Sequence, residues 1–392
     1  MDIIKETKII GNYIIALRNY FHRHPELSLK EFVTSKKIKS ELDKINVQYI
    51  ETAGTGVAAF IGNGNGRTIA LRSDMDGLLI NEKTGLPYES ENEGIMHACG
   101  HDAHMASLLG AAIILKKYEN TLPGRVVLIF QPAEESSLGA KLISEEGVLD
   151  DVDEIFGLHV FGDIECGKIS IEKGPRMAAS NKFGIRIKGR SGHAGKPNQC
   201  VDATVVCAAI IMNLQTIISR EINPLDSAVV TIGHVSSGKC HNVISGEAFI
   251  EGTVRSFSMN TSRHIEKSIK RIVYGTAASY GATVEVDYNV SSHPAVINDE
   301  EATKTALEAA GRIFEQQDIV HIPKMMLSED FSIYQKKIPG VFAFVGAGNE
   351  ELGRDYPNHS ERFNIDEKAV LISTALYVAY AIEALKKENR KH

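Results

Sequence analysis

The sequence has neither a long apolar run nor a concentrated basic tract. Its apolar runs, such as AAIIL (111–115) and VVLIF (126–130), are far shorter than the roughly 20 residues that a membrane-spanning helix needs. The formal net charge is -7 at pH 7, and no stretch interleaves aromatic with basic residues. Because a general nucleic-acid binder needs a basic surface, we expect neither a nucleic acid nor a membrane as a partner.

Cysteine is scarce, and its odd count of five shows no spacing typical of a disulfide framework. The N-terminal stretch MDIIKETKIIGNYIIALRN contains acidic residues and no small-residue cleavage site, so it is not typical of a signal peptide. Both features favour a reduced, cytoplasmic protein. We expect four of the cysteines to be ordinary small apolar residues, whereas Cys99 has unusual neighbours. The cysteines are Cys99, Cys166, Cys200, Cys207 and Cys240.

The length of 392 residues predicts two or three domains, at roughly 100–200 residues per domain. After a helical start that Pro25 interrupts, short apolar strands alternate with helical stretches up to about residue 175. This alternation is typical of an α/β sheet with helices on its faces. The expected strands are 57–62, 68–73, 125–130 and 154–160, and the expected helices are 102–118 and 137–147.

The pattern changes after this part and then returns to the α/β style. The middle of the chain reads strand, helix, strand, strand, helix, strand, which is the order of a ferredoxin-like unit. These elements are expected at 183–189, 201–220, 228–235, 247–257, 260–280 and 282–290. A helix over 299–315, a strand over 341–347 and a helix over 366–387 follow. We therefore predict an α/β domain in two parts, 1–181 and 293–392, with a smaller α+β domain inserted at 182–292.

The segment MHACGHDAH (96–104) concentrates side chains that bind metals or carry protons. Other such side chains follow the predicted strands, and in open α/β sheets sites lie beyond the carboxyl ends of strands. We therefore expect the two sets to meet at one edge of the sheet. The members are His97, Cys99, His101, Asp102 and His104 in the segment, and Asp74, Asp76, Glu134, Glu135, His159 and His359 elsewhere.

Cysteine thiolate, imidazole and carboxylate are the usual protein ligands of zinc, and mixed sets also hold manganese, cobalt or nickel. A catalytic metal lowers the pKa of its bound water from 15.7 to about 7, so that a nearby carboxylate can take the proton. The adjacent Glu134 and Glu135 would supply one ligand and one base. Each feature taken alone has a plainer interpretation, such as a solvated glutamate pair, aspartates that cap a turn, or a histidine-rich surface tract.

Several motifs in combination resemble the metal-dependent amidohydrolases that include hippurate hydrolases, bacterial aminoacylases and plant indole-acetyl-amino-acid hydrolases. This family belongs to the wider aminoacylase and carboxypeptidase group of metallopeptidases. The resemblance runs from HRHPELSLKE (22–31) to the final helix. It implies a mixed-sheet catalytic domain with an inserted ferredoxin-like lid or dimerisation domain. The motifs are MHACGHDAH, FQPAEE (130–135), GLHV (157–160), GHAGKP (192–197) and HSERFNIDE (359–367).

The resemblance also implies residue roles and a cofactor. It implies two divalent metal ions, zinc or manganese, or else cobalt or nickel, held by Cys99, His101, Glu135, His159 and His359. It further implies that Glu134 is the general base, that Asp76 supports the metal site, and that His193 stabilises the oxyanion. Asn242 and Arg255 stand where the family contacts the substrate carboxylate. The departures are RSDMDGLLI (72–80), Ser245 and Asn198, and they put the substrate pocket in doubt rather than the metal site.

The expected activity is hydrolysis of the amide bond of an N-acyl amino acid, with a small-molecule substrate and a homodimer or homotetramer as the assembly. A metallopeptidase of the same fold, acting on a free amino terminus or a dipeptide, is the alternative. A catalytically silent binding protein is a third interpretation, and the intact set of ligands with Glu134 speaks against it. Taken without the resemblance, His193 could be only a hairpin tip and Arg255 only a strand-edge cation.

Overall fold

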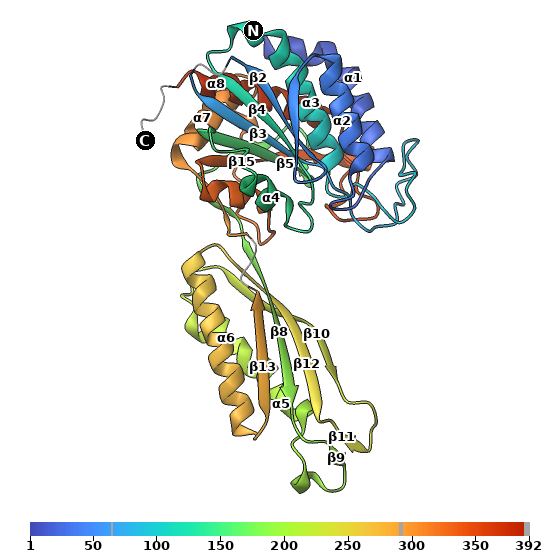
Figure 1. Ribbon diagram of the computed structural model, residues 1–392, viewed down its shortest axis with the longest axis vertical. Helices are drawn as coiled ribbons and strands as arrows, with labels where there is room; N and C mark the ends of the chain where they lie inside the picture. Colours follow the sequence, from blue (N-terminus) through green and yellow to red (C-terminus); the bar gives the residue numbers. More distant parts are fainter. Residues whose placement is uncertain (64–65, 290–292, 388–392) are drawn as a thin grey trace. The chain divides into compact units, whose positions relative to one another are not determined.

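The computed structural model describes residues 1–63, 66–289 and 293–387, and the chain divides into two compact units (Figure 1). Unit 1 comprises Met1–Arg176, Ile297–Pro323 and Asp330–His392, and unit 2 comprises Met177–Val296 and Lys324–Glu329. The domain ranges 1–181, 182–292 and 293–392 remain predictions, and the boundary at residue 292 falls outside the described residues. Each unit has its own apolar core.

Unit 1 is built on a seven-stranded mixed sheet of order β1-β2-β4-β3-β5-β15-β6. The four central strands β4, β3, β5 and β15 run parallel, and the outer strands are antiparallel. Every residue of β3 and β15 is buried, as expected for parallel strands that are covered on both faces, and β15 is accordingly apolar throughout. The strands are β1 (Gln48–Thr52), β2 (Gly56–Gly62), β3 (Thr68–Asp74), β4 (Arg125–Gln131), β5 (Glu154–Glu165), β6 (Ile169–Ser170) and β15 (Gly340–Gly348).

Helices cover this sheet and complete the core of unit 1. Helices α3 and α8 pack against each other and against β3, α1 packs on both of them, and α7 packs on α8. The helix predicted over 299–315 ends earlier, at Ala310, because Gly311 follows and is a poor helix former. The helices are α1 (Ile3–Arg23), α2 (Phe32–Lys44), α3 (His101–Lys117), α4 (Gly139–Glu145), α7 (Glu300–Ala310) and α8 (Lys368–Leu385).

Unit 2 has the predicted ferredoxin-like order, with an antiparallel sheet β10-β12-β8-β13. Along β8 the buried Phe183, Ile185 and Ile187 alternate with exposed residues and join the core that α5 and α6 cover. The elements are β8 (Ala179–Lys188), α5 (Ala203–Thr216), β10 (Ala228–Ser237), β12 (Glu247–Ser256), α6 (Met259–Ser279) and β13 (Thr283–Asn289). Residue 290 of the strand predicted over 282–290 lies outside the described residues.

Four short strands stand outside the two large sheets. In unit 2, β9 (Gly192–His193) pairs with β11 (Val243–Ile244), and both strands carry or adjoin predicted site residues. The other two, β7 (Gly174–Met177) and β14 (Val296–Asn298), pair with each other. The fold class predicted from the sequence, a mixed α/β sheet with an α+β insertion, is therefore confirmed.

Two helical stretches are long and apolar enough to cross a membrane by length and composition, namely Ala203–Glu221 and Lys368–Leu385. In the second stretch, which is α8, 72% of the apolar window is buried inside the structure, as in a core helix. In the first, only 33% is buried. Core helices of globular proteins pass the same test, so these two stretches are weak grounds for a membrane span.

Candidate metal centre

The predicted site residues of unit 1 gather at the carboxyl ends of its parallel strands. Asp76 lies two residues after β3, Glu134 and Glu135 lie in the loop after β4, and His159 lies on β5. Cys99 immediately precedes the turn into α3, which begins at His101. Since parallel strands end at the same edge of a sheet, the fold alone explains why residues so distant in sequence meet.

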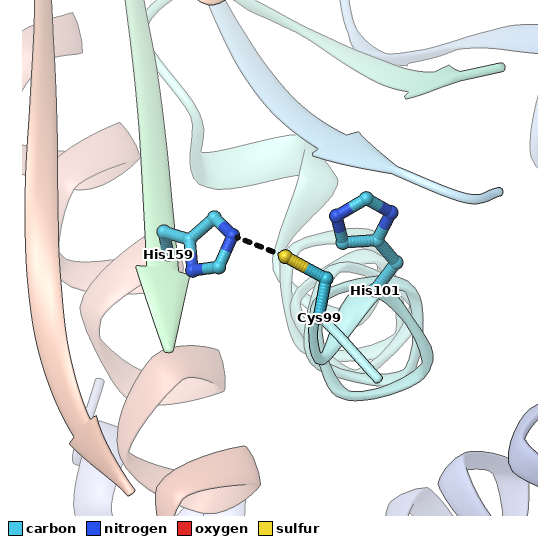
Figure 2. Close-up of side chains that lie close together, drawn as sticks. All are labelled: Cys99, His101 and His159. Carbon is cyan, nitrogen blue, oxygen red and sulfur yellow. Dashed lines mark hydrogen bonds between the residues drawn. The ribbon is translucent and has the colours of Figure 1, made fainter. Parts of the chain in front are cut away.

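The side chains of six residues form one continuous group that includes Cys99. The thiol Sγ of Cys99 lies 3.4 Å from Nε2 of His159 and 3.2 Å from Nε2 of His359. Figure 2 shows Cys99 between the imidazoles of His101 and His159, with its sulfur close to both rings. Nε2 of His359 lies 3.5 Å from Oε1 of Glu135. Three overlapping sets have ligand atoms within 4.8 Å of one another: Cys99, His101 and His159; Cys99, Glu135 and His359; His101, Glu134 and Glu135.

Hydrogen bonds fix how two of the histidines face this group. Nδ1 of His101 donates to the backbone carbonyl of Asp76 at 2.9 Å, and Nδ1 of His159 donates to the carbonyl of Val160 at 2.8 Å. In each ring, Nε2 is therefore left to face the centre. Nε2 of His101 and Oε1 of Glu135 are buried, and among the described residues neither makes a hydrogen bond of ordinary geometry; their polar neighbours are Asp74, 3.8 Å from Nε2, and His359, 3.5 Å from Oε1. Buried orphan atoms of this kind, beside a thiol, fit a divalent metal such as zinc.

The charges around the centre oppose one another in the metal-free protein. Burial raises the pKa of the Cys99 thiol, and the nearby Glu135 charge raises it further. Hydrogen bonds to Cys99 and Glu135 raise the pKa of His359 to about 10. Burial disfavours a charged His101, but the Asp74 charge and hydrogen bonds to Asp76 and Cys99 outweigh it and raise its pKa well above the ordinary value. Without a metal, protons thus occupy this cluster of donors.

Glycine is required between the two donors Cys99 and His101. Gly100 has φ 92° and stands at the N-terminus of α3, a left-handed conformation that glycine adopts without strain. A Cβ atom on Gly100 would lie 2.4 Å from Cγ2 of Val160. The close approach of Gly100 to β5 brings Cys99 and His159 together, which explains the Cys-Gly-His order of the motif.

Asp76 organises the loop that carries the two glutamates. Its carboxylate oxygens accept from the backbone N–H groups of Glu134 and Glu135, each at 3.1 Å, and from the Ser28 hydroxyl at 2.7 Å. Burial alone would raise the pKa of Asp76, but its hydrogen bond with His101 helps to hold that pKa below the ordinary value. Asp76 therefore orients both the glutamates and His101.

Asp74 and His104, which were expected at the same edge of the sheet but without a role of their own, both lie beside the centre. Nδ1 of His104 donates to Oδ1 of Asp74 at 2.6 Å, and Arg72 donates to the other oxygen of Asp74 at 2.7 Å. All three side chains are fully buried. The spacing of His104, three residues after His101 on a predicted helix, could have suggested that the two share a helix face.

His359 reaches the centre from a strained loop. Its φ of 68° lies in the left-handed region, which costs a non-glycine residue roughly 1–2 kcal/mol. The backbone N–H of His359 donates to the carbonyl of Ala98 at 2.7 Å, next to Cys99. Strain of this kind persists only where the surroundings hold it, and it clusters at functional sites.

The remaining predicted residues lie in unit 2. His193 is exposed on β9, its Nδ1 accepts from the Gly195 N–H at 3.0 Å, and its strand pairs with Val243, next to Asn242. His193 and Asn242 are therefore neighbours. Arg255 is eight residues along β12 from Glu247, about 26 Å at 3.3 Å per residue, towards the opposite end of that strand. Unit 2 brings the first two residues together and keeps Arg255 apart from them.

The chain also matches a family of known proteins. The sequence model of peptidase family M20/M25/M40 matches residues 70–383. The chain belongs to this family. The relationship inferred from the motifs is thereby confirmed, and the match spans both units of this M20/M25/M40 family member.

Three curated relatives align with nearly the whole M20/M25/M40 chain. An N-acetylcysteine deacetylase of Bacillus subtilis is 40% identical and the alignment covers 97% of this chain and 98% of the relative. An IAA-amino acid hydrolase ILR1-like 4 of Arabidopsis thaliana is 38% identical, covering 97% of this chain and 89% of that protein. A thermostable carboxypeptidase 2 of Saccharolobus solfataricus is 36% identical, covering 100% of both.

Two solved structures have the same fold as this M20/M25/M40 family member. A putative aminohydrolase from methicillin-resistant Staphylococcus aureus superposes with a TM-score of 0.92 at 37% identity, covering 99% of this chain and 100% of that one. A dinuclear metal-binding peptidase of the M20 family from Bacillus subtilis superposes with a TM-score of 0.85 at 36% identity, and the superposition covers 97% of this chain and 99% of that one. The fold therefore agrees with experimental structures of the family.

Proposed function

We propose that the chain is a metal-dependent amidohydrolase that cleaves the amide bond of N-acyl amino acids to a carboxylate and a free amino acid. The observation that carries this proposal is that one thiol, three imidazoles and one carboxylate form overlapping sets of possible metal ligands beside Glu134. Two relatives have names that fit it, an N-acetylcysteine deacetylase and an IAA-amino acid hydrolase. An acetyl or aroyl amide of an amino acid is the substrate class.

Cys99, His101, Glu135, His159 and His359 would hold two divalent metal ions, zinc or manganese, with cobalt or nickel as substitutes. The ligand types suit these metals, and the M20 family relative of known structure is described as a dinuclear metal-binding peptidase. When bound, such ions polarise the substrate carbonyl and lower the pKa of a water molecule.

Glu134 is the general base in this proposal. It lies with Glu135 and His101 in one group of ligand atoms, and Asp76 holds its backbone N–H at 3.1 Å. Glu134 takes a proton from the attacking water and then delivers it to the leaving amine, a type of catalysis worth about 10²–10⁴ in rate. Asp76 acts by keeping Glu134 in place beside the ligand Glu135.

The residues of unit 2 bind the substrate in this proposal. His193 donates a hydrogen bond to the tetrahedral oxyanion, a contribution of about 2.7–4 kcal/mol. Asn242 and Arg255 bind the substrate carboxylate. Arg255 lies about 26 Å along β12 from the end of the strand that is next to Asn242. Within one chain, Asn242 and Arg255 therefore cannot both bind the same small carboxylate. The two residues would serve one substrate only if two copies of the chain contribute.

A homodimer or homotetramer therefore belongs to the proposal. Helix α5 supports it, because its outer face leaves Val205 49% and Met212 69% exposed. All five cysteines are free, which agrees with the proposed cytoplasmic location.

The alternative activity, that of a metallopeptidase acting on unblocked peptides, is favoured by the full-length relative that is named a carboxypeptidase.

The proposal is tested by release of amino acid from a panel of N-acetyl and N-benzoyl amino acids, with unblocked dipeptides assayed in parallel. The protein is stripped with a chelator and reloaded with zinc or manganese. We expect metal-dependent release from the blocked substrates. Cleavage of dipeptides alone would replace the amidohydrolase with the peptidase. Silence on both panels, with two metals bound per chain, would favour a binding protein.

A further inference from the structure

The side chain of Asn358 joins three segments of the chain that carry metal-binding candidates. Its Nδ2 donates to the backbone carbonyl of Cys99 at 3.0 Å and to that of Val160 at 3.1 Å. Its Oδ1 accepts from the N–H of Gly162 at 3.3 Å. Asn358 itself immediately precedes His359. One amide thus connects the turn before α3, the second half of β5 and the loop of His359.

Only an amide can make this set of hydrogen bonds. Two carbonyl oxygens require two donors and the N–H of Gly162 requires an acceptor, so the orientation of the Asn358 amide is determined by its partners. An aspartate at this position would place a carboxylate against the carbonyls of Cys99 and Val160 and would donate to neither. Asn358 therefore has no hydrogen left to offer to a substrate or to a water.

The backbone geometry of the next residue shows what these bonds hold. His359 has φ 68°, a conformation that a histidine keeps only when its surroundings fix it. The side-chain amide of Asn358, the residue before His359, is hydrogen-bonded to the carbonyls of Cys99 and Val160. The backbone N–H of His359 itself donates to the carbonyl of Ala98 at 2.7 Å. The carbonyl of Val160 also accepts from Nδ1 of His159 at 2.8 Å, so Asn358 and His159 share one acceptor.

We propose that Asn358 is a positioning residue that assembles Cys99, His159 and His359 into one metal-binding group. This inference rests on the ligand set of the proposed function. Asn358 acts through the backbone: it sets the distance between the three segments and, through the shared Val160 carbonyl, the ring orientation of His159. Partners outside the ligand shell typically change metal affinity by about 10–100-fold.

The inference is tested by titrating cobalt(II) into the chelator-stripped full-length protein and recording its absorption. A cysteine ligand gives cobalt a thiolate charge-transfer band, so both the affinity and the geometry at Cys99 are read without any substrate. The variants are Asn358→Asp, which is nearly isosteric, and Asn358→Ala, which adds no charge. Asn120→Asp, at an exposed position on the same unit, is the matched control. Thermal melts of the metal-free proteins are recorded alongside.

We expect both Asn358 variants to bind cobalt at least about tenfold more weakly and with an altered thiolate band, while their metal-free melts stay close to that of the parent protein. Excess metal should restore most of kcat, because Asn358 does not touch the substrate. Parent-like affinity and spectrum in both variants would overturn the inference. Cys99→Ser separates this inference from the proposed function. If Cys99→Ser leaves the thiolate band unchanged, the proposed ligand set is wrong. If Cys99→Ser removes the band but the Asn358 variants leave it unaltered, only the role of Asn358 is wrong.

Discussion

The backbone N–H of Val160 donates to Nε2 of His104 at 3.0 Å, which determines the tautomer of that buried histidine. Because Nε2 is the acceptor, the proton of His104 lies on Nδ1 and is donated to Asp74 at 2.6 Å. Both ring nitrogens are therefore used by the protein, and His104 is not available as a ligand although it stands between His101 and His159. It holds the residue that follows His159 on β5.

Replacing His104 should therefore weaken metal binding without removing a ligand. His104→Leu leaves the Val160 N–H without its partner, removes one of the donors to the Asp74 carboxylate, which keeps Arg72, and loosens β5 at Val160. We expect about a 10–100-fold loss of affinity for the first metal equivalent, measured by competition with a chromophoric chelator. His241→Leu, at an exposed position of unit 2, is the control. An unchanged affinity in His104→Leu would show that β5 is held without this bond.

Metal loading should release protons. Hydrogen bonds to Cys99 and Glu135 raise the pKa of His359 to about 10, so at pH 8 the metal-free protein carries a proton there that the metal must displace. The apparent affinity should rise as the pH increases towards 10 and fall as it decreases. Calorimetry at pH 8 in two buffers of different ionisation enthalpy counts the protons. His359→Ala should release fewer, and an absence of buffer dependence in the parent protein would contradict this pKa.

The extent to which the sequence predicted the structure differs between the fold and the site. The β3 strand, expected over 68–73, and the α3 helix, expected over 102–118, were located to within a residue because each has a clear apolar segment, Ile69–Leu71 in β3 and Ala111–Leu115 in α3. The edge strand β1 was missed, since three of its five residues are exposed and it lacks such a pattern.

Site residues named by motif were brought together by the fold, whereas Asp74, His104 and Asn358 were given no role. His104 and Asn358 matter through hydrogen bonds to the main chain of Val160, and Asp74 matters through its hydrogen bond with His104. Main-chain partners leave no mark in residue spacing. The left-handed backbone of His359 could not be anticipated either, because only glycine and asparagine commonly signal that conformation.

The ion pair between Arg18 and Asp102 should dominate the stability of unit 1 near α3. The two side chains are fully buried at 2.7 Å, and His22 contacts the same carboxylate at 2.9 Å. Asp102→Asn leaves the Arg18 charge unpaired, so we expect a loss of about 3–5 kcal/mol in urea unfolding of the metal-free protein at pH 7. In a double-mutant cycle, the double variant Arg18→Met with Asp102→Leu should lose less stability than the single variants Arg18→Met and Asp102→Leu added together. A double-variant loss equal to the sum of the two single losses would contradict the pairing of Arg18 with Asp102.

The same pair should give the protein an acid limit. Burial alone would raise the pKa of Asp102, but the Arg18 charge outweighs it and holds the pKa well below the ordinary value. A carboxylate with a depressed folded pKa contributes stability above its unfolded pKa of about 3.9 and loses it as the pH falls further. The difference between the parent protein and Asp102→Asn should therefore shrink as the pH falls below about 4. A difference that does not vary with pH would contradict this assignment.

Glu134 and Glu135 are adjacent and chemically identical, yet Glu134 is proposed as the general base and Glu135 as a metal ligand. A comparison of the two residues therefore tests the proposed mechanism most directly. Glu134→Gln and Glu135→Gln are compared for metal content and for turnover of an N-acyl amino acid that the parent protein cleaves. We expect Glu134→Gln to keep two metals per chain and to lose about 10²–10⁴ in kcat, and Glu135→Gln to lose metal. Turnover near the parent rate in Glu134→Gln would contradict the assignment of the general base and, with it, the proposed mechanism.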